Sequence, residues 1–148
     1  MPIKIVNGDM LSSPGLDLIV NPVNTRGVMG AGLARKVKAT YPMAFAEYRR
    51  YCRIGRLGPG DVLLTTGERL IAHAATKGDW RLPSSYAIVE ECLITLDQLL
   101  NCLAVKTVGV PALGCGLGGL DWREVCDMMH SILDQPDKDI WLYKPRSG

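Results

Sequence analysis

Short apolar runs alternate with longer amphipathic segments along most of this chain. Runs rich in Val, Ile and Leu predict six strands, at residues 3–6, 17–20, 62–65, 70–75, 105–110 and 139–143. Apolar residues at helical spacing predict four helices, at residues 31–39, 42–53, 84–100 and 121–133. The alternation of strands and helices predicts an α/β fold whose sheet is covered by helices on both faces, with ligands at the carboxyl ends of the strands.

Turn and capping residues refine this scheme. Gly67, between two of the strands, predicts a hairpin, so we expect a mixed rather than a purely parallel sheet. Pro42 suits the first turn of the second helix. Ser84 or Ser85 is expected to cap the third helix, and Asp121 the fourth.

Two glycine-rich turns follow apolar runs and precede helices. The first run leads into residues 21–24, expected as a turn, and then into Gly27-Val28-Met29-Gly30-Ala31-Gly32. The run at 105–110 leads into Pro111-Ala112-Leu113-Gly114-Cys115-Gly116-Leu117-Gly118-Gly119. Glycines at the start of a helix let backbone N–H groups approach an anion, and the helix N-terminus favours negative charge. Two such loops predict a ligand with two phosphates.

The second turn also matches the G-x-G-x-x-G fingerprint of dinucleotide-binding folds, at Gly114, Gly116 and Gly119. In that fold an acidic residue about twenty positions further on ends a strand, whereas here Asp139 begins one. A phosphate loop of another fold is therefore the preferred interpretation, and tight turn chemistry alone is the alternative.

Polar or aromatic residues stand at or just after the ends of four predicted strands. The Asp9 carboxylate could accept a hydrogen bond from a base amine, or it could cap a turn. Asn24 both donates and accepts, which suits a ribose hydroxyl. Lys77, beside Asp79, Trp80 and Arg81, could act as a base or nucleophile at an anomeric carbon, or as a fixed charge beside phosphates. Tyr143 is suited to stacking on a base or to the core.

Composition narrows the class of protein. A chain of 148 residues with 47% hydrophobic content is expected to form one domain over 1–148. Its net charge of +2 does not by itself indicate nucleic-acid binding. Basic residues do cluster at residues 49–56 and 77–81, which permits a nucleic-acid strand near the site, although a solvated helix face is the commoner explanation of such clusters.

Cysteine and histidine spacing gives no sign of a metal or redox site. The five cysteines are scattered without any C-x-x-C pair, and His73 and His130 have no ligand partners at metal spacing. No apolar leader or membrane-length apolar run is present in the sequence. We therefore expect a cytoplasmic protein with reduced thiols, no membrane association, no metal and no cofactor.

Together these residues resemble the macrodomain family, whose members bind ADP-ribose. Val6-Asn7-Gly8-Asp9 looks like the adenine-contacting start, residues 21–32 like the ribose loop, and residues 114–119 like the diphosphate loop. The resemblance covers nearly the whole chain. It implies a three-layer α/β/α sandwich with a mixed central sheet.

Within that family, the chain is most similar to the DarG antitoxin branch. The matching segments are residues 20–25 and 27–32, Thr76-Lys77, and residues 114–122. That branch removes ADP-ribose from thymidine bases of single-stranded DNA and so reverses a toxin. The resemblance implies an ADP-ribosyl glycohydrolase, a hydrolase of DNA repair, with ADP-ribosylated single-stranded DNA as substrate and a cognate ADP-ribosyltransferase toxin as a partner.

The resemblance also assigns roles to residues of this chain. It implies that Lys77 and Asn24 are catalytic. The implied ligand-binding residues are Asp9, Met10, Asn21, Asn24, Val28, Gly30, Ala31, Gly32, Thr76, Gly114, Cys115, Gly116, Leu117, Gly118 and Tyr143. Asp9 would hold the adenine amine, Tyr143 the adenine face, Asn24 the distal ribose, and the loop backbones the phosphates.

One departure bears on mechanism. A related human glycohydrolase that acts on glutamate esters has an aspartate in the second loop where this chain has Gly118. Three alternatives stay open: a reader that binds ADP-ribose without chemistry, a hydrolase of protein glutamate-ester ADP-ribose, and a hydrolase of ADP-ribose 1″-phosphate.

Overall fold

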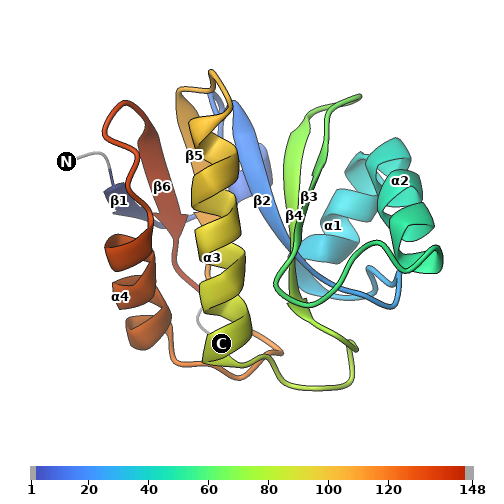
Figure 1. The fold of residues 1–148 in the computed structure, drawn as a ribbon. Coiled ribbons are helices and arrows are strands. Elements are labelled where there is room, and N and C mark those ends of the chain that lie inside the picture. The colour runs from blue at the N-terminus through green and yellow to red at the C-terminus, as the bar shows by residue number, and fades with distance from the viewer. Residues whose placement is uncertain (1–2, 146–148) are drawn as a thin grey trace.

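A six-stranded sheet organises residues 3–145, which the computed structural model describes (Figure 1). The strands are β1 Ile3–Val6, β2 Leu18–Asn24, β3 Val62–Thr65, β4 Leu70–Lys77, β5 Thr107–Pro111 and β6 Asp139–Tyr143. The helices are α1 Gly32–Thr40, α2 Pro42–Arg53, α3 Tyr86–Asn101 and α4 Trp122–Ile132, with a 3₁₀ helix, η1, at Met10–Ser12. All six predicted strands and all four predicted helices are confirmed; η1 was not predicted.

The strand order places the predicted polar positions along one edge. The order is β1-β6-β5-β2-β4-β3, and every neighbouring pair is parallel except β3 and β4, which form the expected antiparallel hairpin. The mixed sheet is therefore confirmed. The carboxyl ends of the five parallel strands meet at the same edge, in the order β1, β6, β5, β2, β4.

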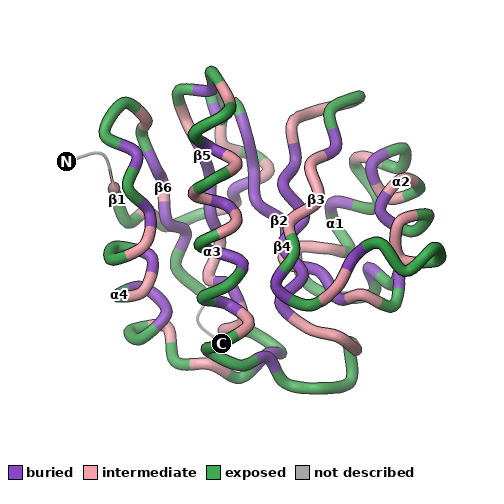
Figure 2. Tube along the Cα trace, viewed as in Figure 1, coloured by how far each residue is buried: buried purple, intermediate pink, exposed green. Residues whose placement is uncertain are grey.

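Helices cover both faces of the sheet, which confirms the three-layer sandwich (Figure 1). Along β2, Leu18 and Val20 pack with α3 and α4, whereas Ile19 and Val23 belong to a second core with α1 and α2. This alternation follows from the two-residue period of a strand. Figure 2 shows the consequence, with the central strands largely buried and the outward helix surfaces exposed.

β2 is longer than predicted. Residues 21–24, expected as a turn, continue the strand and pair with β4 as far as Asn24. Pro22 is tolerated because β2 registers with β5 only at Leu18–Val108 and Ile19–Gly109, so beyond these pairs one side of β2 has no partner strand. From there the chain turns to α1 on one face after β2, and to α4 on the other face after β5. Strands β2 and β5 thus separate at a topological switch point, where open α/β sheets bind ligands.

The hydrogen bonds at the start of α3 show which of the two serines is its N-cap. The Ser85 side chain accepts a hydrogen bond from the Ile88 amide and is the N-cap, whereas Ser84 makes no such bond. Asp121 caps α4 as predicted, through the Arg123 amide. None of the helices within residues 3–145 has the length and apolar character needed to cross a membrane.

Candidate functional site

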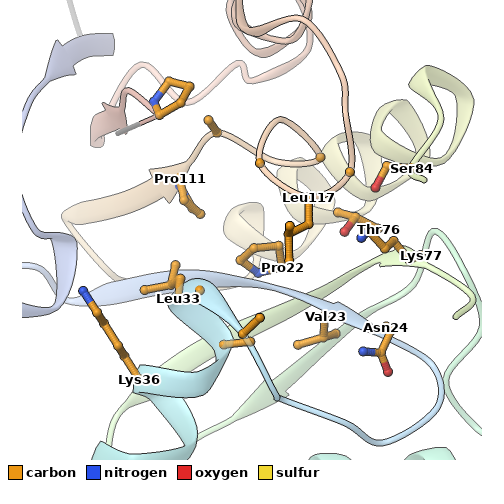
Figure 3. A pocket seen from close by; sticks show the side chains of 18 of the residues that line it. Pro22, Val23, Asn24, Leu33, Lys36, Thr76, Lys77, Ser84, Pro111 and Leu117 are labelled. Atoms are coloured by element: carbon orange, nitrogen blue, oxygen red, sulfur yellow. The ribbon is translucent and has the colours of Figure 1, made fainter. Parts of the chain in front are cut away.

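A cavity of about 900 Å³ opens at the carboxyl edge of the sheet, between the ends of β2 and β5 (Figure 3). Its lining residues come from segments at or after the ends of all five parallel strands, within residues 8–10, 22–36, 76–84, 111–118 and 143–145, although not every residue of these segments faces the cavity. Its walls are mostly backbone and apolar side chains, with a few polar groups. The cavity is therefore long enough to span the sheet edge from β1 to β4.

The first glycine-rich loop presents unpaired backbone donors to this cavity. α1 begins with Ala31 as an N-cap that has no side-chain hydrogen bond. Gly32 adopts a φ of +56°, a left-handed conformation that favours glycine. Within the described part of the chain, the N–H groups of residues 30–33 have no hydrogen-bond acceptor. An uncapped helix start of this kind attracts an anionic group.

The second loop presents a matching row of donors. The N–H groups of Gly116, Leu117 and Gly118 also have no acceptor among residues 3–145. Cys115 differs, because its N–H donates to the Ala112 carbonyl at 3.1 Å. Cys115 also does not line the cavity. Burial raises the pKa of the Cys115 thiol to about 11, so the thiol is neutral. The loop therefore offers amides, and not a thiolate, to the cavity.

The second loop closes too tightly for a side chain at Gly118. A Cβ atom there would lie 2.4 Å from the Gly114 carbonyl oxygen. That same oxygen accepts a hydrogen bond from the Leu120 amide at 2.9 Å, and the Gly118 carbonyl accepts one from the Ser84 amide at 3.1 Å. This loop geometry thus requires glycine at position 118.

Asn24, at the end of β2, fixes the first loop. Its Oδ1 accepts hydrogen bonds from the amides of Arg26 at 2.9 Å and Val28 at 3.4 Å. Its Nδ2 donates to the Val28 carbonyl at 2.8 Å. The buried Tyr48 hydroxyl lies 2.7 Å from the Asn24 carbonyl and 3.1 Å from Oδ1. Asn24 lines the cavity with one amide hydrogen beyond the bond to Val28, while its oxygen is committed to the loop.

Asn21 lies in the core instead of the cavity. Its fully buried side chain contacts His73 Nδ1 at 3.1 Å, and His73 Nε2 lies 2.9 Å from the Thr65 hydroxyl. Tyr48 stacks on His73 with ring centroids 6.0 Å apart. Burial lowers the pKa of His73 to about 4, so its ring is neutral near pH 7. This network of buried side chains fixes the position of β2 near its carboxyl end.

Thr76 and Lys77 end β4 at the far side of the cavity. Both line it, and Figure 3 shows their side chains close to the loop that carries Leu117, with Asn24 nearby. Thr76 is buried, whereas Lys77 is half-buried. Within residues 3–145 the Lys77 ammonium forms no ion pair or hydrogen bond. Its charge is therefore available to a ligand.

Asp9 and Tyr143 mark the opposite end of the cavity. The Asp9 carboxylate caps η1, accepting from the Leu11 amide at 3.1 Å and the Ser12 hydroxyl at 2.8 Å. The Tyr143 hydroxyl donates to Ser13 Oγ at 2.8 Å. Both residues line the cavity beside buried Met10. Asp9 thus has the capping role that the sequence left open, at a position that also faces the site.

Three polar cavity residues were not among the predicted ligand contacts: Lys36, Ser84 and Lys144. Ser84 is only 7% exposed, and its hydroxyl has no hydrogen-bond partner in the described structure. The sequence did carry a signal for Ser84. Two serines precede the helix, and because only one of them is needed as its N-cap, the other is free for a different role. No cluster of three or more potential metal ligands occurs among residues 3–145.

Comparison with known proteins identifies the family of this chain. The family model described as Macro domain matches residues 20–129. The chain is 36% identical over 148 aligned residues to a DNA ADP-ribosyl glycohydrolase of Mycobacterium tuberculosis, covering 96% of this chain and 42% of that protein. It therefore spans about two fifths of that relative's length.

Solved structures show the same fold. The macrodomain of Mycobacterium tuberculosis DarG matches with a TM-score of 0.93 and 37% identity, covering 97% of this chain and 98% of that one. Thermosipho africanus DarTG in complex with ADP-ribose matches with a TM-score of 0.90 and 30% identity, covering 99% of this chain and 43% of that one. A curated Thermosipho africanus relative, 32% identical over 97% of this chain and 42% of its own length, is a DNA ADP-ribosyl transferase–DNA ADP-ribosyl glycohydrolase fusion protein. The chain belongs to the Macro domain family.

Proposed function

We propose that this macrodomain binds ADP-ribose in the cavity and hydrolyses the bond that joins ADP-ribose to a base of single-stranded DNA. The observation that carries the proposal is the unpaired Lys77 ammonium at one end of a cavity walled by two rows of unpaired amides. The names of the relatives, a DNA ADP-ribosyl glycohydrolase and a DarTG bound to ADP-ribose, support the choice of substrate.

The strand order gives the ligand a direction. Adenine would lie near Asp9 and Tyr143, beyond β1 and β6. The diphosphate would lie in the middle, between residues 30–33 and residues 116–118, where the unpaired N–H groups face the opening between β2 and β5. The distal ribose would then reach Asn24 and Lys77. A nucleotide with two phosphates would satisfy both rows of donors at once.

The chemistry follows from this placement. Water would add its oxygen to the anomeric carbon of the distal ribose while the bond from that carbon to the base breaks, and a proton would pass to the released base. Positive charge develops on the ribose in such a step, and the adjacent diphosphate would stabilise it. Lys77 would either activate the water or stabilise the leaving base with its ammonium.

The proposal is tested by ADP-ribose release. Wild type should release ADP-ribose from a thymidine-ADP-ribosylated oligonucleotide, whereas Lys77→Ala should bind ADP-ribose but show no turnover. Lys77→Arg separates the two roles, since arginine keeps the charge but is too weak an acid to exchange protons near pH 7. Lys106→Ala, an exposed lysine just before β5 at the opposite end of that strand, is the matched control.

Two results would redirect the proposal. Release from a glutamate-ADP-ribosylated protein but not from the oligonucleotide would make the substrate a protein ester. ADP-ribose binding without release from either substrate would make the chain a reader. We further propose that a cognate ADP-ribosyltransferase attaches the ADP-ribose that this site removes. The fusion of the two activities in the Thermosipho africanus relative supports this partner.

A further inference from the structure

The loops that follow β2 and β4 are tied together at the mouth of the cavity. The Thr25 hydroxyl donates to the Gly78 carbonyl at 2.8 Å. This bond places Arg26, from the first loop, beside Asp79, Trp80 and Arg81, which follow Lys77 directly. We call these four residues the Asp79 rim: Arg26, Asp79, Trp80 and Arg81.

Asp79 orients the two arginines of the rim. Its carboxylate accepts from Arg81 Nε at 3.0 Å and Nη2 at 2.7 Å, and it lies 3.7 Å from Arg26 Nε. The Asp79 side chain is 17% exposed, while each arginine side chain is 60% exposed. The hydrogen bond from Arg81 lowers the pKa of Asp79, which keeps the carboxylate ionised. One shielded acid thus holds two exposed guanidinium groups in place, leaving the rim with a net positive charge.

Trp80 adds an exposed aromatic surface to the rim. It lines the cavity, is 52% exposed, and carries the Arg81 guanidinium carbon 5.5 Å from its ring centroid. A tryptophan that only filled the core would be buried. An exposed aromatic ring beside a guanidinium is the arrangement on which unpaired bases stack.

Positive charge continues from the rim along α2. The position of a Cβ on Gly27 lies 3.6 Å from the Arg49 side chain, so α2 packs next to the Arg26 loop. Exposed arginines follow at positions 49, 50 and 53 of α2 and at position 56 just beyond it, and α2 has a single acidic residue, Glu47. A phosphodiester backbone leaving the cavity mouth would meet this strip.

We propose that the Asp79 rim and the arginines of α2 bind the single-stranded DNA on either side of the modified base. The inference rests on the proposed function and adds the surface that would select a nucleic-acid strand. Trp80 would stack on a base next to the modified nucleotide, and the exposed guanidinium groups would contact phosphates. The arginines of the rim and of α2 do not line the cavity, so free ADP-ribose bound there would not engage them.

The test compares two substrates that differ only in the presence of flanking nucleotides. These are ADP-ribosylated thymidine as a nucleoside and the same modification at the centre of a ten-nucleotide single strand. Wild type should show a higher kcat/KM on the oligonucleotide. The ratio of kcat/KM on the oligonucleotide to kcat/KM on the nucleoside should fall about tenfold in Trp80→Ala, as expected for the loss of one stacked base. An Arg49→Gln/Arg53→Gln variant should lower the ratio and weaken its dependence on salt.

A binding measurement keeps the inference separate from turnover. Fluorescence anisotropy of a labelled, unmodified oligothymidylate reports strand binding even if no ADP-ribose is released. Weaker binding by Trp80→Ala and by Arg49→Gln/Arg53→Gln, but not by Lys106→Ala, would support the inference. Equal ratios and equal anisotropy for wild type and both variants would overturn it. Losses on a glutamate-ADP-ribosylated protein that are absent on the oligonucleotide would also overturn it, in favour of a protein partner.

Discussion

The loop after β2 is held in shape by side chains, whereas the loop after β5 is held by its own backbone. Asn24 and Tyr48 bind the first loop through four side-chain hydrogen bonds to main-chain groups of residues 24–28 and one to each other. Backbone bonds such as Leu120 N–H to the Gly114 carbonyl close the second, with no room for a side chain at Gly118. The same row of free amides can thus be built by adding polar side chains or by excluding them. The two loops should therefore respond to different substitutions.

The largest expected effect comes from adding one carbon to the second loop. In Gly118→Ala the new Cβ must move away from the Gly114 oxygen, 2.4 Å distant, and the loop must open. We expect a loss of about 3 kcal/mol in the free energy of unfolding, at the upper end for overpacking, and at least a tenfold loss of ADP-ribose affinity. Thermal denaturation and calorimetric titration measure the two effects.

Gly116→Ala is the matched control for the stability measurement. A Cβ at Gly116 meets nothing within 4 Å, and its φ is not in the left-handed region. Its free energy of unfolding should stay within about 0.5 kcal/mol of wild type. Equal stability of the two alanine variants would contradict the account of the second loop.

Lowering the pH should loosen the first loop before it loosens the second. His73 has a pKa of about 4 in the folded chain, below its ordinary value of 6.5, because it is buried. The unfolded chain therefore binds the proton first, and stability is lost as pH falls from about 6.5 to about 4. The loss totals on the order of 3 kcal/mol. The difference between wild type and His73→Gln in denaturation at several pH values isolates this contribution from the carboxylates.

Direct titration keeps this prediction testable if His73→Gln does not fold. The His73 ring resonances of wild type should titrate near pH 4, and amide exchange in residues 24–31 should rise before exchange in residues 112–119. A His73 pKa near 6.5 would contradict the prediction.

Asn24→Ala should remove the side-chain clamp of the first loop. The variant loses both amide-to-Oδ1 bonds and leaves the Val28 carbonyl without its donor. We expect a loss of about 2 kcal/mol, together with slower ADP-ribose release from the oligonucleotide. Chemical denaturation measures the first effect and product release the second. Unchanged release would remove Asn24 from the proposed catalytic site.

Tyr48→Phe should have the smallest effect, because it removes one hydroxyl and keeps the buried ring. The Asn24 carbonyl would lose its 2.7 Å donor, at a cost of about 1 kcal/mol. Tyr51→Phe, which alters a half-buried tyrosine on the same helix, should leave stability unchanged. Indistinguishable thermal midpoints for the two variants would contradict a role for Tyr48 in holding Asn24.

The sequence predicted the fold closely because its signals are local. Apolar runs and helical spacing depend on neighbouring residues, and they placed all six strands and all four α-helices of residues 3–145. The exception, residues 21–24 of β2, carries Pro22, which reads as a turn unless the absence of a partner strand on one side is known. That absence depends on the sheet order, which periodicity does not encode.

The site was predicted in part. The two glycine loops, Lys77 and Tyr143 do line one cavity, as the strand-end argument anticipated. Asn21 lies in the core instead, because it stands three residues before the end of β2 and its side chain contacts His73. Ser84 was interpreted only as a cap, since nothing local distinguishes it from Ser85, which takes that role.

Backbone amide NMR during titration with ADP-ribose tests the central claim most directly, namely that both loops bind one diphosphate. We predict the largest shifts at the amides of residues 30–33 and 116–118 together, with adenosine, which lacks phosphates, leaving both groups nearly unchanged. Shifts confined to one loop, or centred elsewhere on the protein, would contradict it.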